Sequence, residues 1–221
     1  MSRRIIITFH GLGEPPDWID AAEKRYWVPV PLFEDIVART AARPEVEYTF
    51  DDGNRSDFDV AAPLLRRHGR VGGFYVLTGR LGHSAYLTPA DVRALCEQGM
   101  TIGLHGRDHV DWRNLDDRQL AEETIEARNR LAEVAGQPVT AVSIPFGAYN
   151  RRVMRHLAAC GYQAILTTDG GLADDRSRVR NRTSIRSDMT TAEIDAILAG
   201  RASPASSLRR AASTFVRRRL V

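Results

Sequence analysis

The stretch Val46–Gly53, with the sequence VEYTFDDG, is the most informative part of this chain. It begins with a short, mostly apolar run that is typical of a strand buried on both faces. Two adjacent carboxylates, Asp51 and Asp52, follow directly at the strand end. Because neighbouring side chains there can point in different directions, one carboxylate could bind a metal ion while the other takes a proton. An Asp-Gly turn, which is common, is the alternative.

Short apolar runs recur along the chain with helical patterns between them. The seven runs predicted to be strands are Ile5–Phe9, Val46–Phe50, Val71–Val76, Thr101–His105, Val139–Ile144, Tyr162–Leu166 and Arg182–Arg186. Seven such strands could form an open doubly wound sheet or a closed barrel, and the pattern alone does not separate the two. The polar stretch 170–180 is predicted to be a loop.

The predicted helices between these strands have readable ends. Thr88, Asp116 and Thr190 are each followed three residues later by a side chain that can complete a capping box. The pattern predicts one long helix from 116 to 136 and another from 150 to 161. Strands that alternate with helices indicate βαβ units, parallel pairing and the α/β class.

A second polar cluster, with the sequence HGRDH, occupies His105–His109 directly after a predicted strand. Two histidines four residues apart can converge on one ion if the segment makes a turn, although two unrelated surface histidines are the alternative. With Asp52 they would form a two-histidine, one-carboxylate site that suits Zn²⁺ and other divalent transition metals. All three follow the C-terminal ends of predicted parallel strands, the edge that carries the active site in such folds.

A third segment, Ser143–Asn150 (SIPFGAYN), ends a predicted strand and opens a helix. Its proline, its glycine and the coming helix leave backbone N–H groups free to point into the site. Such groups can stabilise an oxyanion, whereas a plain strand-to-helix turn is the alternative.

The order TFDDG, HGRDH, IPFGAYN resembles the polysaccharide deacetylase family, the nodulation-protein-B homology domain of carbohydrate esterase family 4. The resemblance runs from about Ile5 to Gly200. It implies a distorted seven-stranded (β/α) barrel, TIM-barrel-like, and metal-dependent removal of an acetyl group from an N-acetylated sugar. It further implies roles for five residues: Asp51 as catalytic base, Asp52, His105 and His109 as metal ligands, and the Phe146 backbone as oxyanion donor.

Three positions depart from the family pattern. Gly106 stands where a hydroxyl residue is frequent, and Ser143 stands where an arginine usually orients the base. The stretch 182–188 (RTSIRSD) has no histidine, whereas the family usually supplies its general acid there. The resemblance therefore leaves the acid and the orienting group unassigned.

His10 is a candidate for the missing acid. In a closed barrel the first and last strands are neighbours, so His10 would lie where the absent histidine belongs. With a reference pKa of about 6.5 it could protonate a leaving amine. The alternative is a histidine that holds the first loop by hydrogen bonds.

Arg182, Arg186 and Arg107 are candidates for orienting Asp51, because a nearby arginine would lower the pKa of that base and fix its rotamer. The more common alternative for each is an exposed surface charge.

Residues that flank the proposed site could bind the sugar. Pro145, Tyr149 and Trp112 are predicted to contact substrate. The aromatic faces of Tyr149 and Trp112 suit the apolar faces of pyranose rings. For the Phe146 ring, packing is the favoured interpretation. The segment Gly11–Val30 is long enough to shape the mouth of the site.

The 221 residues are 43% hydrophobic and 27% charged, values that exclude a disordered, collagen-like or disulfide-stapled chain. The net charge is +3, yet residues 201–221 hold six arginines and no acid, so the body is acidic and no nucleic-acid partner is expected. We predict a catalytic domain over 1–200 and a basic tail over 201–221. The tail could contact an anionic membrane surface weakly, or be a frayed terminus.

The N-terminal apolar run is shorter than a signal-peptide core, and no stretch approaches the roughly 20 apolar residues of a membrane span, so a cytoplasmic location is predicted. Cys96 and Cys160 are predicted to be free, partly buried thiols. Two functional alternatives stay open: a hydrolase of a non-sugar amide or imide on the same scaffold, and a saccharide-binding protein that has lost turnover.

Overall fold

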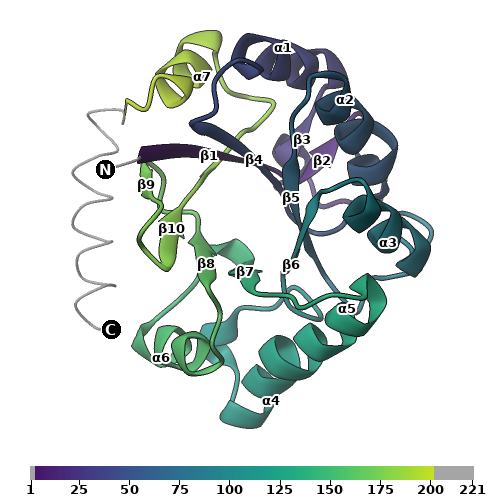
Figure 1. Cartoon of the computed structure of the whole chain (residues 1–221), viewed down its shortest axis with the longest axis vertical. Coiled ribbons are helices and arrows are strands. Elements are labelled where there is room, and N and C mark those ends of the chain that lie inside the picture. The colour runs from purple at the N-terminus through teal and green to yellow at the C-terminus, as the bar shows by residue number, and fades with distance from the viewer. Residues whose placement is uncertain (1–2, 202–221) are drawn as a thin grey trace.

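A ring of short, mostly parallel strands forms the centre of the fold, and helices lie around its outside (Figure 1). The structure is a computed structural model that describes residues 3–201, so most of the predicted basic tail lies outside the described residues. Within that range, hydrogen-bonded neighbours follow the order β10-β8-β7-β6-β5-β4-β1-β11. These strands are β1 (Arg3–Phe9), β4 (Val46–Phe50), β5 (Gly72–Val76), β6 (Thr101–Leu104), β7 (Ala141–Ser143), β8 (Ala164–Thr167), β10 (Val179–Asn181) and β11 (Thr183–Ser184).

The ring closes through the last two strands. β10 pairs with β8 and β11 pairs with β1, both in parallel, and only Arg182 separates the two strands in sequence. The Arg182 amide donates to the Thr167 carbonyl oxygen at 3.1 Å, and the Ile185 amide donates to the Thr8 carbonyl oxygen at 2.9 Å. The prediction of a distorted seven-stranded barrel is therefore confirmed, with β10 and β11 together acting as the seventh segment.

The predicted bounds of this closing strand were wrong. The strand begins at Val179 rather than Arg182 and ends at Ser184, and its first two residues lie within the predicted loop over 170–180. The same stretch contains β9 (Ala173–Asp174), which pairs antiparallel with the start of β1. Val179–Asn181 is only half-buried, so it lacks the continuous apolar character by which the other strands were found.

The helices on the outside of the ring are α1 (Val30–Thr40), α2 (Ala62–Arg67), α3 (Pro89–Glu97), α4 (Asp117–Ala121), α5 (Ala127–Ala135), α6 (Arg151–Ala159) and α7 (Thr191–Leu198). The capping boxes predicted at Thr88, Asp116 and Thr190 are all present. The long helix predicted from 116 to 136 is instead interrupted by a π-helical turn, η4 (Glu122–Glu126), between α4 and α5.

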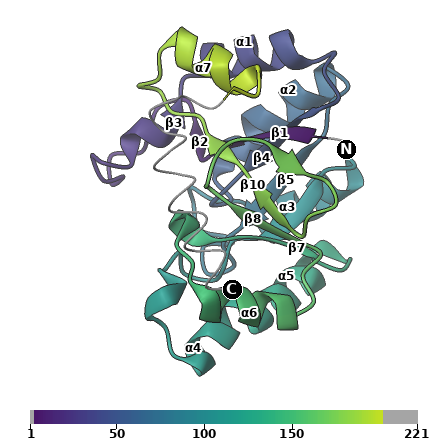
Figure 2. The ribbon, with the colours of Figure 1, turned by 90° about the vertical axis from the view of Figure 1, so that its left-hand side faces the viewer.

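The first and last helices complete the outer layer. Figures 1 and 2 both show α1 and α7 side by side, although they lie at opposite ends of the described chain. Arg39 on α1 forms an ion pair with Asp195 on α7 across this contact. The helical layer thus closes at the same place as the strands beneath it.

The side chains between strands and outer helices are apolar, whereas part of the barrel interior is polar. Phe50 stacks on Phe74 with ring centroids 4.8 Å apart, and both are fully buried. Inside the barrel, the Thr8 and Thr49 hydroxyls form a hydrogen bond of 2.8 Å. The ring of Tyr75 also lies there, and a Cβ at Gly103 would be 2.4 Å from it, so this position requires glycine. These polar interior residues support the site at the strand ends.

A small second sheet and a longer first loop precede α1. The second sheet consists of β2 (Gly11–Leu12) and β3 (Trp27–Val28), which pair in parallel. A short 3₁₀ turn, η1 (Lys24–Tyr26), leads directly into β3.

The cysteines and the helix lengths can be compared with expectation over the described residues. Cys96 and Cys160 are free and half-buried, as predicted. Among the helices of residues 3–201, none has the length and apolar character needed to cross a bilayer.

Candidate active site

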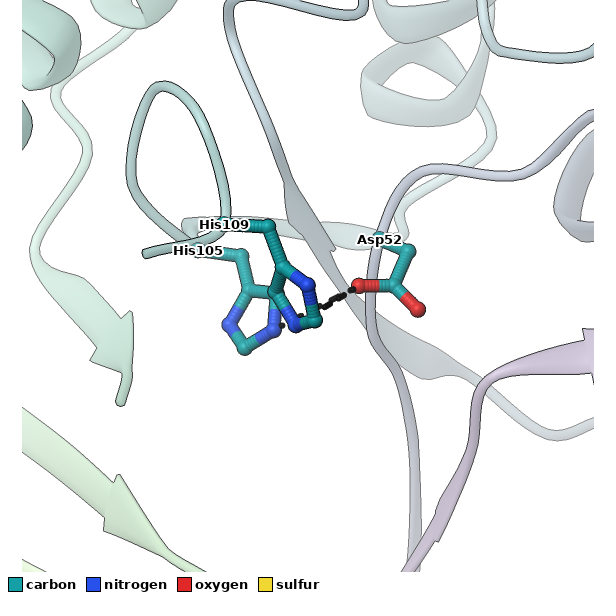
Figure 3. A group of neighbouring side chains, drawn as sticks. All are labelled: Asp52, His105 and His109. Carbon is teal, nitrogen blue, oxygen red and sulfur yellow. Dashed lines mark ion pairs between the residues drawn. The ribbon is translucent and has the colours of Figure 1, made fainter. Parts of the chain in front are cut away.

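Two loops at the carboxyl ends of β4 and β6 bring Asp52, His105 and His109 together (Figure 3). Asp52 Oδ1 lies 3.5 Å from the Nε2 atoms of both histidines. One ligand atom from each of the three residues falls within 4.8 Å of the other two. The juxtaposition predicted from DDG and HGRDH is therefore present in the structure.

The three side chains fit a divalent metal ion. Asp52 Oδ1 and His105 Nε2 are buried and have no hydrogen-bond partner among the described residues. Buried polar atoms without partners are costly, and coordination of a metal ion by these two atoms would offset that cost. Donors in a tetrahedral zinc site lie roughly 3.4 Å from one another, given zinc–ligand distances of about 2.0–2.2 Å. The observed separations of 3.5 Å from Asp52 Oδ1 to the two imidazoles match that spacing.

The orientation of His105 is set by the neighbouring strand. Its ring nitrogen Nδ1 lies 3.0 Å from the backbone carbonyl oxygen of Ser143, at the end of β7. A donated hydrogen bond to that carbonyl leaves Nε2 as the lone-pair nitrogen facing Asp52. For His109, burial lowers the pKa to about 4, so its ring is neutral at neutral pH and able to act as a ligand.

The backbone is constrained at this site. Within residues 3–201, the non-glycine residues with positive φ are Asp52 (77°), His109 (55°) and Phe146 (57°). Non-glycine residues in this left-handed region are uncommon and cluster at functional sites, where the surrounding structure stabilises them. The Phe146 and His109 rings lie 4.3 Å apart between centroids, which brings all three strained positions to one place.

Asp51 lies beside the three proposed ligands but has different partners. Its Oδ1 and Oδ2 atoms each accept a hydrogen bond of 2.8 Å from the Arg182 guanidinium, and the Ser143 hydroxyl donates to Oδ2 at 3.0 Å. Asp51 and Arg182 are both almost completely buried. Burial alone would raise the pKa of Asp51, but the positive charge of Arg182, helped by His105, outweighs it and lowers the pKa to about 2. The carboxylate is therefore ionised and rigidly held.

Among the three arginine candidates, the structure places Arg182 against Asp51. The interpretation of Arg182 as an exposed charge was wrong, because its guanidinium lies inside the barrel and faces the Tyr75 ring at 5.4 Å. Arg107 instead pairs with Asp108 and Glu122, and Arg186 pairs with Asp188. Ser143, at the position that departs from the family pattern, donates to the same carboxylate.

His10 follows β1 and reaches the same site. Its Nδ1 lies 3.5 Å from Asp52 Oδ2, and its Nε2 lies 3.3 Å from the Ser184 hydroxyl on β11. Burial lowers the pKa of His10, but the hydrogen bond and charge of Asp52 outweigh it, so the pKa is raised overall. The expected adjacency of the first and last strands therefore brings His10 into the site.

A cavity of about 240 Å³ opens directly onto these residues. Its lining includes Asp51, Asp52, His10 and His109, together with the aromatic side chains Tyr26, Trp27, Tyr86 and Phe146. Ile19 and Glu23 also line it, so the long segment 11–30 does shape the mouth of the site as expected.

The predicted substrate contacts need correction. Trp112 is fully buried beneath the His105–His109 loop, where its indole N–H donates to Glu123, so it offers no face to a ligand. Tyr149 is 3% exposed and donates to Asp169, and Pro145 is buried too. Conversely, the Phe146 ring, for which packing was favoured, is 58% exposed and lines the cavity.

Comparison with protein families identifies relatives of this chain. The family model described as Polysaccharide deacetylase matches residues 38–165. YxkH of Bacillus subtilis (strain 168) is 28% identical over 125 residues, which are 57% of this chain and 45% of that protein. The peptidoglycan-N-acetylglucosamine deacetylase PgdA of Listeria monocytogenes is 25% identical over 142 residues, 64% of this chain and 29% of that protein. The chain thus spans less than half the length of these curated relatives.

Solved structures share the fold. The deacetylase PplD of Streptococcus pyogenes, in complex with acetate, superposes with a TM-score of 0.73 at 21% identity, covering 91% of this chain and 99% of that one. BC0361, a polysaccharide deacetylase from Bacillus cereus, gives a TM-score of 0.77 at 16% identity, covering 89% and 69%. At these identities the likeness concerns the fold, whereas the family model matches more than half of the sequence. On that match the chain belongs to the polysaccharide deacetylase family.

Proposed function

We propose that this chain is a metal-dependent deacetylase that hydrolyses the N-acetyl group of an N-acetylated sugar in a polysaccharide or glycan precursor. The observation that carries the proposal is a trio of side chains placed close enough to share one ion, with a separate, ionised carboxylate beside it at one barrel edge. Membership of the polysaccharide deacetylase family supports the choice of an N-acetylated sugar.

Asp52, His105 and His109 would hold a divalent ion, for which we propose Zn²⁺ because of the nitrogen and oxygen donors. Such an ion would polarise the acetamide carbonyl and acidify a water molecule. The remaining chemistry belongs to the side chains and backbone around it.

Asp51 would be the general base. It takes a proton from the water that attacks the acetyl carbon, while the carbonyl electron pair moves onto the oxygen. Arg182 and Ser143 act through Asp51, because their hydrogen bonds fix both of its oxygens in one orientation. The base is therefore aimed before substrate arrives, which reduces the entropic cost of reaching the transition state.

The backbone N–H of Phe146 would donate to the oxyanion. The C–N bond then breaks as His10 donates a proton to the departing sugar amine, and the acetic acid that forms gives its proton to solvent and leaves as acetate. His10 then takes a proton from solvent, which restores its starting state. The proton on Asp51 passes to solvent. His10 is proposed for this step because it lines the same cavity as Asp51. We expect His10→Gln to lower turnover by at least about 100-fold while zinc stays bound. Near wild-type turnover would remove His10 from the acid role.

The surroundings of the cavity favour a polymer over a small amide or imide. A neighbouring cavity of about 670 Å³ shares Tyr26, Thr168 and Ser184 with it. A third cavity, also of about 670 Å³, shares Ile19, Glu23, Arg80 and Tyr86 with the site cavity. The site cavity therefore lies between two larger hollows that could receive neighbouring sugars.

The experiment that tests this function measures acetate released by the zinc-loaded protein from N-acetylglucosamine oligomers, next to ring opening of cyclic imides. Acetate release that Asp51→Asn abolishes is expected. Ring opening without acetate release would favour the amide or imide alternative. Oligomer binding without any turnover would favour a saccharide-binding protein.

Three further predictions concern the surroundings of the protein. A cytoplasmic location, the lack of a nucleic-acid partner and a weak membrane contact through the basic tail stay predictions from the sequence. The division into a catalytic domain over 1–200 and a tail over 201–221 is proposed on the same basis.

A further inference from the structure

Glu123 is a buried acidic residue on the π-helical turn η4, and it faces the loop that carries both histidines. Its Oε2 accepts a 2.8 Å hydrogen bond from the Arg107 amide, and its Oε1 accepts one of 3.2 Å from the Asp108 amide. The Trp112 indole N–H also donates to Oε2, at 3.4 Å. One carboxylate thus gathers three donors, two of which are backbone groups between the proposed ligands.

The opposite side of the loop is fixed by backbone pairing. The Thr78 amide donates to the Gly106 carbonyl oxygen at 3.1 Å, and the Gly79 amide donates to the Arg107 carbonyl oxygen at 2.9 Å. The amides of the loop therefore point toward Glu123 while its carbonyls point toward the segment after β5. Glu123 is the side chain that binds the amide side of the loop.

The residue after His105 fits closely against this carboxylate. Gly106 has a φ of 98°, and a Cβ placed there would lie 2.7 Å from Glu123 Oε2. A larger residue would displace the carboxylate, so glycine at 106 and glutamate at 123 are coupled.

The π-helical turn η4 helps to place the Glu123 side chain. A π-turn inserts an extra residue into a helix and re-aims its side chains, and such turns are frequent at functional sites. Here it separates α4 from α5, and Glu123 is buried while its neighbour Glu122 pairs with Arg107 and Arg118 at the surface.

We propose that Glu123 is a positioning residue that presets the His105–His109 loop for metal binding. This inference rests on the proposed metal-dependent function, because it concerns the same ligands. Groups that orient metal ligands typically change metal affinity by about 10- to 100-fold when they are replaced. Glu123 would act in this way through the backbone of the loop rather than through the imidazoles.

The test is the zinc affinity of the full chain, measured by competition with a chromophoric chelator. Glu123→Gln puts an NH₂ group, which cannot accept, opposite one of the loop amides. We expect it to weaken zinc binding by about 10-fold or more. Glu123→Asp keeps the charge but withdraws the carboxylate, and we expect a similar loss; it also serves if the glutamine variant does not fold. The matched control is Glu122→Gln, which should stay within about 2-fold of wild type.

Thermal unfolding with and without zinc separates positioning from general stability. A tenfold loss of affinity removes about 1.4 kcal/mol of the zinc-induced stabilisation, whereas a packing defect lowers both unfolding temperatures equally. Wild-type zinc affinity in both Glu123 variants would overturn the positioning role of Glu123 but leave the proposed metal site standing. An equal loss of zinc affinity in Glu122→Gln would do the same. A wild-type chain that binds no zinc would overturn the proposed metal site as well.

Discussion

At the scale of single residues, the site depends on one buried ion pair. Asp51 and Arg182 come from β4 and the closing strand, and neither has appreciable access to water. The sequence could supply Asp51 through its motif, but it could not identify Arg182. Arg107, Arg182 and Arg186 were equally good candidates for orienting Asp51, and only the register of the barrel shows which of them faces inward.

We predict that Arg182→Leu lowers the free energy of unfolding by about 3–5 kcal/mol, because it leaves a buried carboxylate without its cation. Adding Asp51→Asn should recover most of that loss, since the charge is then gone. Urea denaturation of both variants measures the effect. Arg186→Leu, which removes a pair with the exposed Asp188, is the control and should cost no more than about 1 kcal/mol. Equal losses in Arg182→Leu and Arg186→Leu would contradict the prediction.

A second buried acid makes stability depend on pH. Asp57 is fully buried, and neither side-chain oxygen has a hydrogen-bond partner among the described residues. Burial raises its pKa well above the usual value, and the charges of Asp52 and Asp51 raise it further. Its contribution to stability is therefore complete below the unfolded pKa of about 3.9 and is lost as pH rises through the folded value.

Asp57→Asn should abolish this loss, so the unfolding temperature of the variant relative to wild type should increase from pH 4 to pH 8. Thermal unfolding of the metal-free proteins at several pH values measures the difference. Asp59→Asn is the control, because Asp59 lies two residues further along the chain and its side chain is exposed. A difference between Asp57→Asn and wild type that does not change with pH would count against the prediction.

At the scale of helices and strands, the helix caps and the regular strands could be predicted from local sequence, whereas the irregular elements could not. The capping boxes and six of the strands follow from short-range patterns, and all are present within a few residues of their predicted ends. The break at η4 and the half-polar start of the closing strand carry no such pattern. Both are stabilised by contacts with distant segments: Glu123 with the histidine loop, and β10 with β8.

The cap at Thr88 offers a test at this scale. Its hydroxyl accepts from the Asp91 amide, while the Asp91 carboxylate accepts from the Thr88 amide at 2.8 Å. Thr88→Ala should lower the free energy of unfolding by about 0.5–2 kcal/mol, whereas Thr88→Ser should retain most of the cap. Chemical denaturation of both variants distinguishes them, and an equal loss in both would show that the hydroxyl is not what stabilises α3.

At the scale of the whole molecule, closure of the barrel turns separate motifs into one site. β1 brings His10, β4 brings both aspartates, β6 brings both histidines, and the closing strand brings Arg182. The family resemblance was sufficient to predict this arrangement in outline. It was not sufficient to predict which aromatic rings face the cavity, because burial of Trp112 and exposure of Phe146 depend on loop packing.

The exposed Trp18 provides a prediction about substrate length. It is 65% exposed and lines one of the larger cavities beside the site. We expect Trp18→Ala to raise KM for long N-acetylglucosamine oligomers by about 2- to 10-fold, the equivalent of one aromatic contact. The KM for the N-acetylglucosamine disaccharide should not change. Val71→Ala removes another exposed apolar side chain, before β5 at the opposite end of the barrel, and is the control. An equal rise in KM for both lengths would contradict a contact with a distant sugar.

In the proposed site, Asp52, His105 and His109 hold one ion while Asp51 stays free to act as a base. Zinc stoichiometry of the purified chain and its variants, determined by isothermal titration, tests it most directly. We predict that wild type and the Asp51→Asn variant, which should be inactive, each bind one equivalent of zinc, and that His105→Ala loses it. Zinc binding that survives His105→Ala, or that disappears in a folded Asp51→Asn, would contradict it.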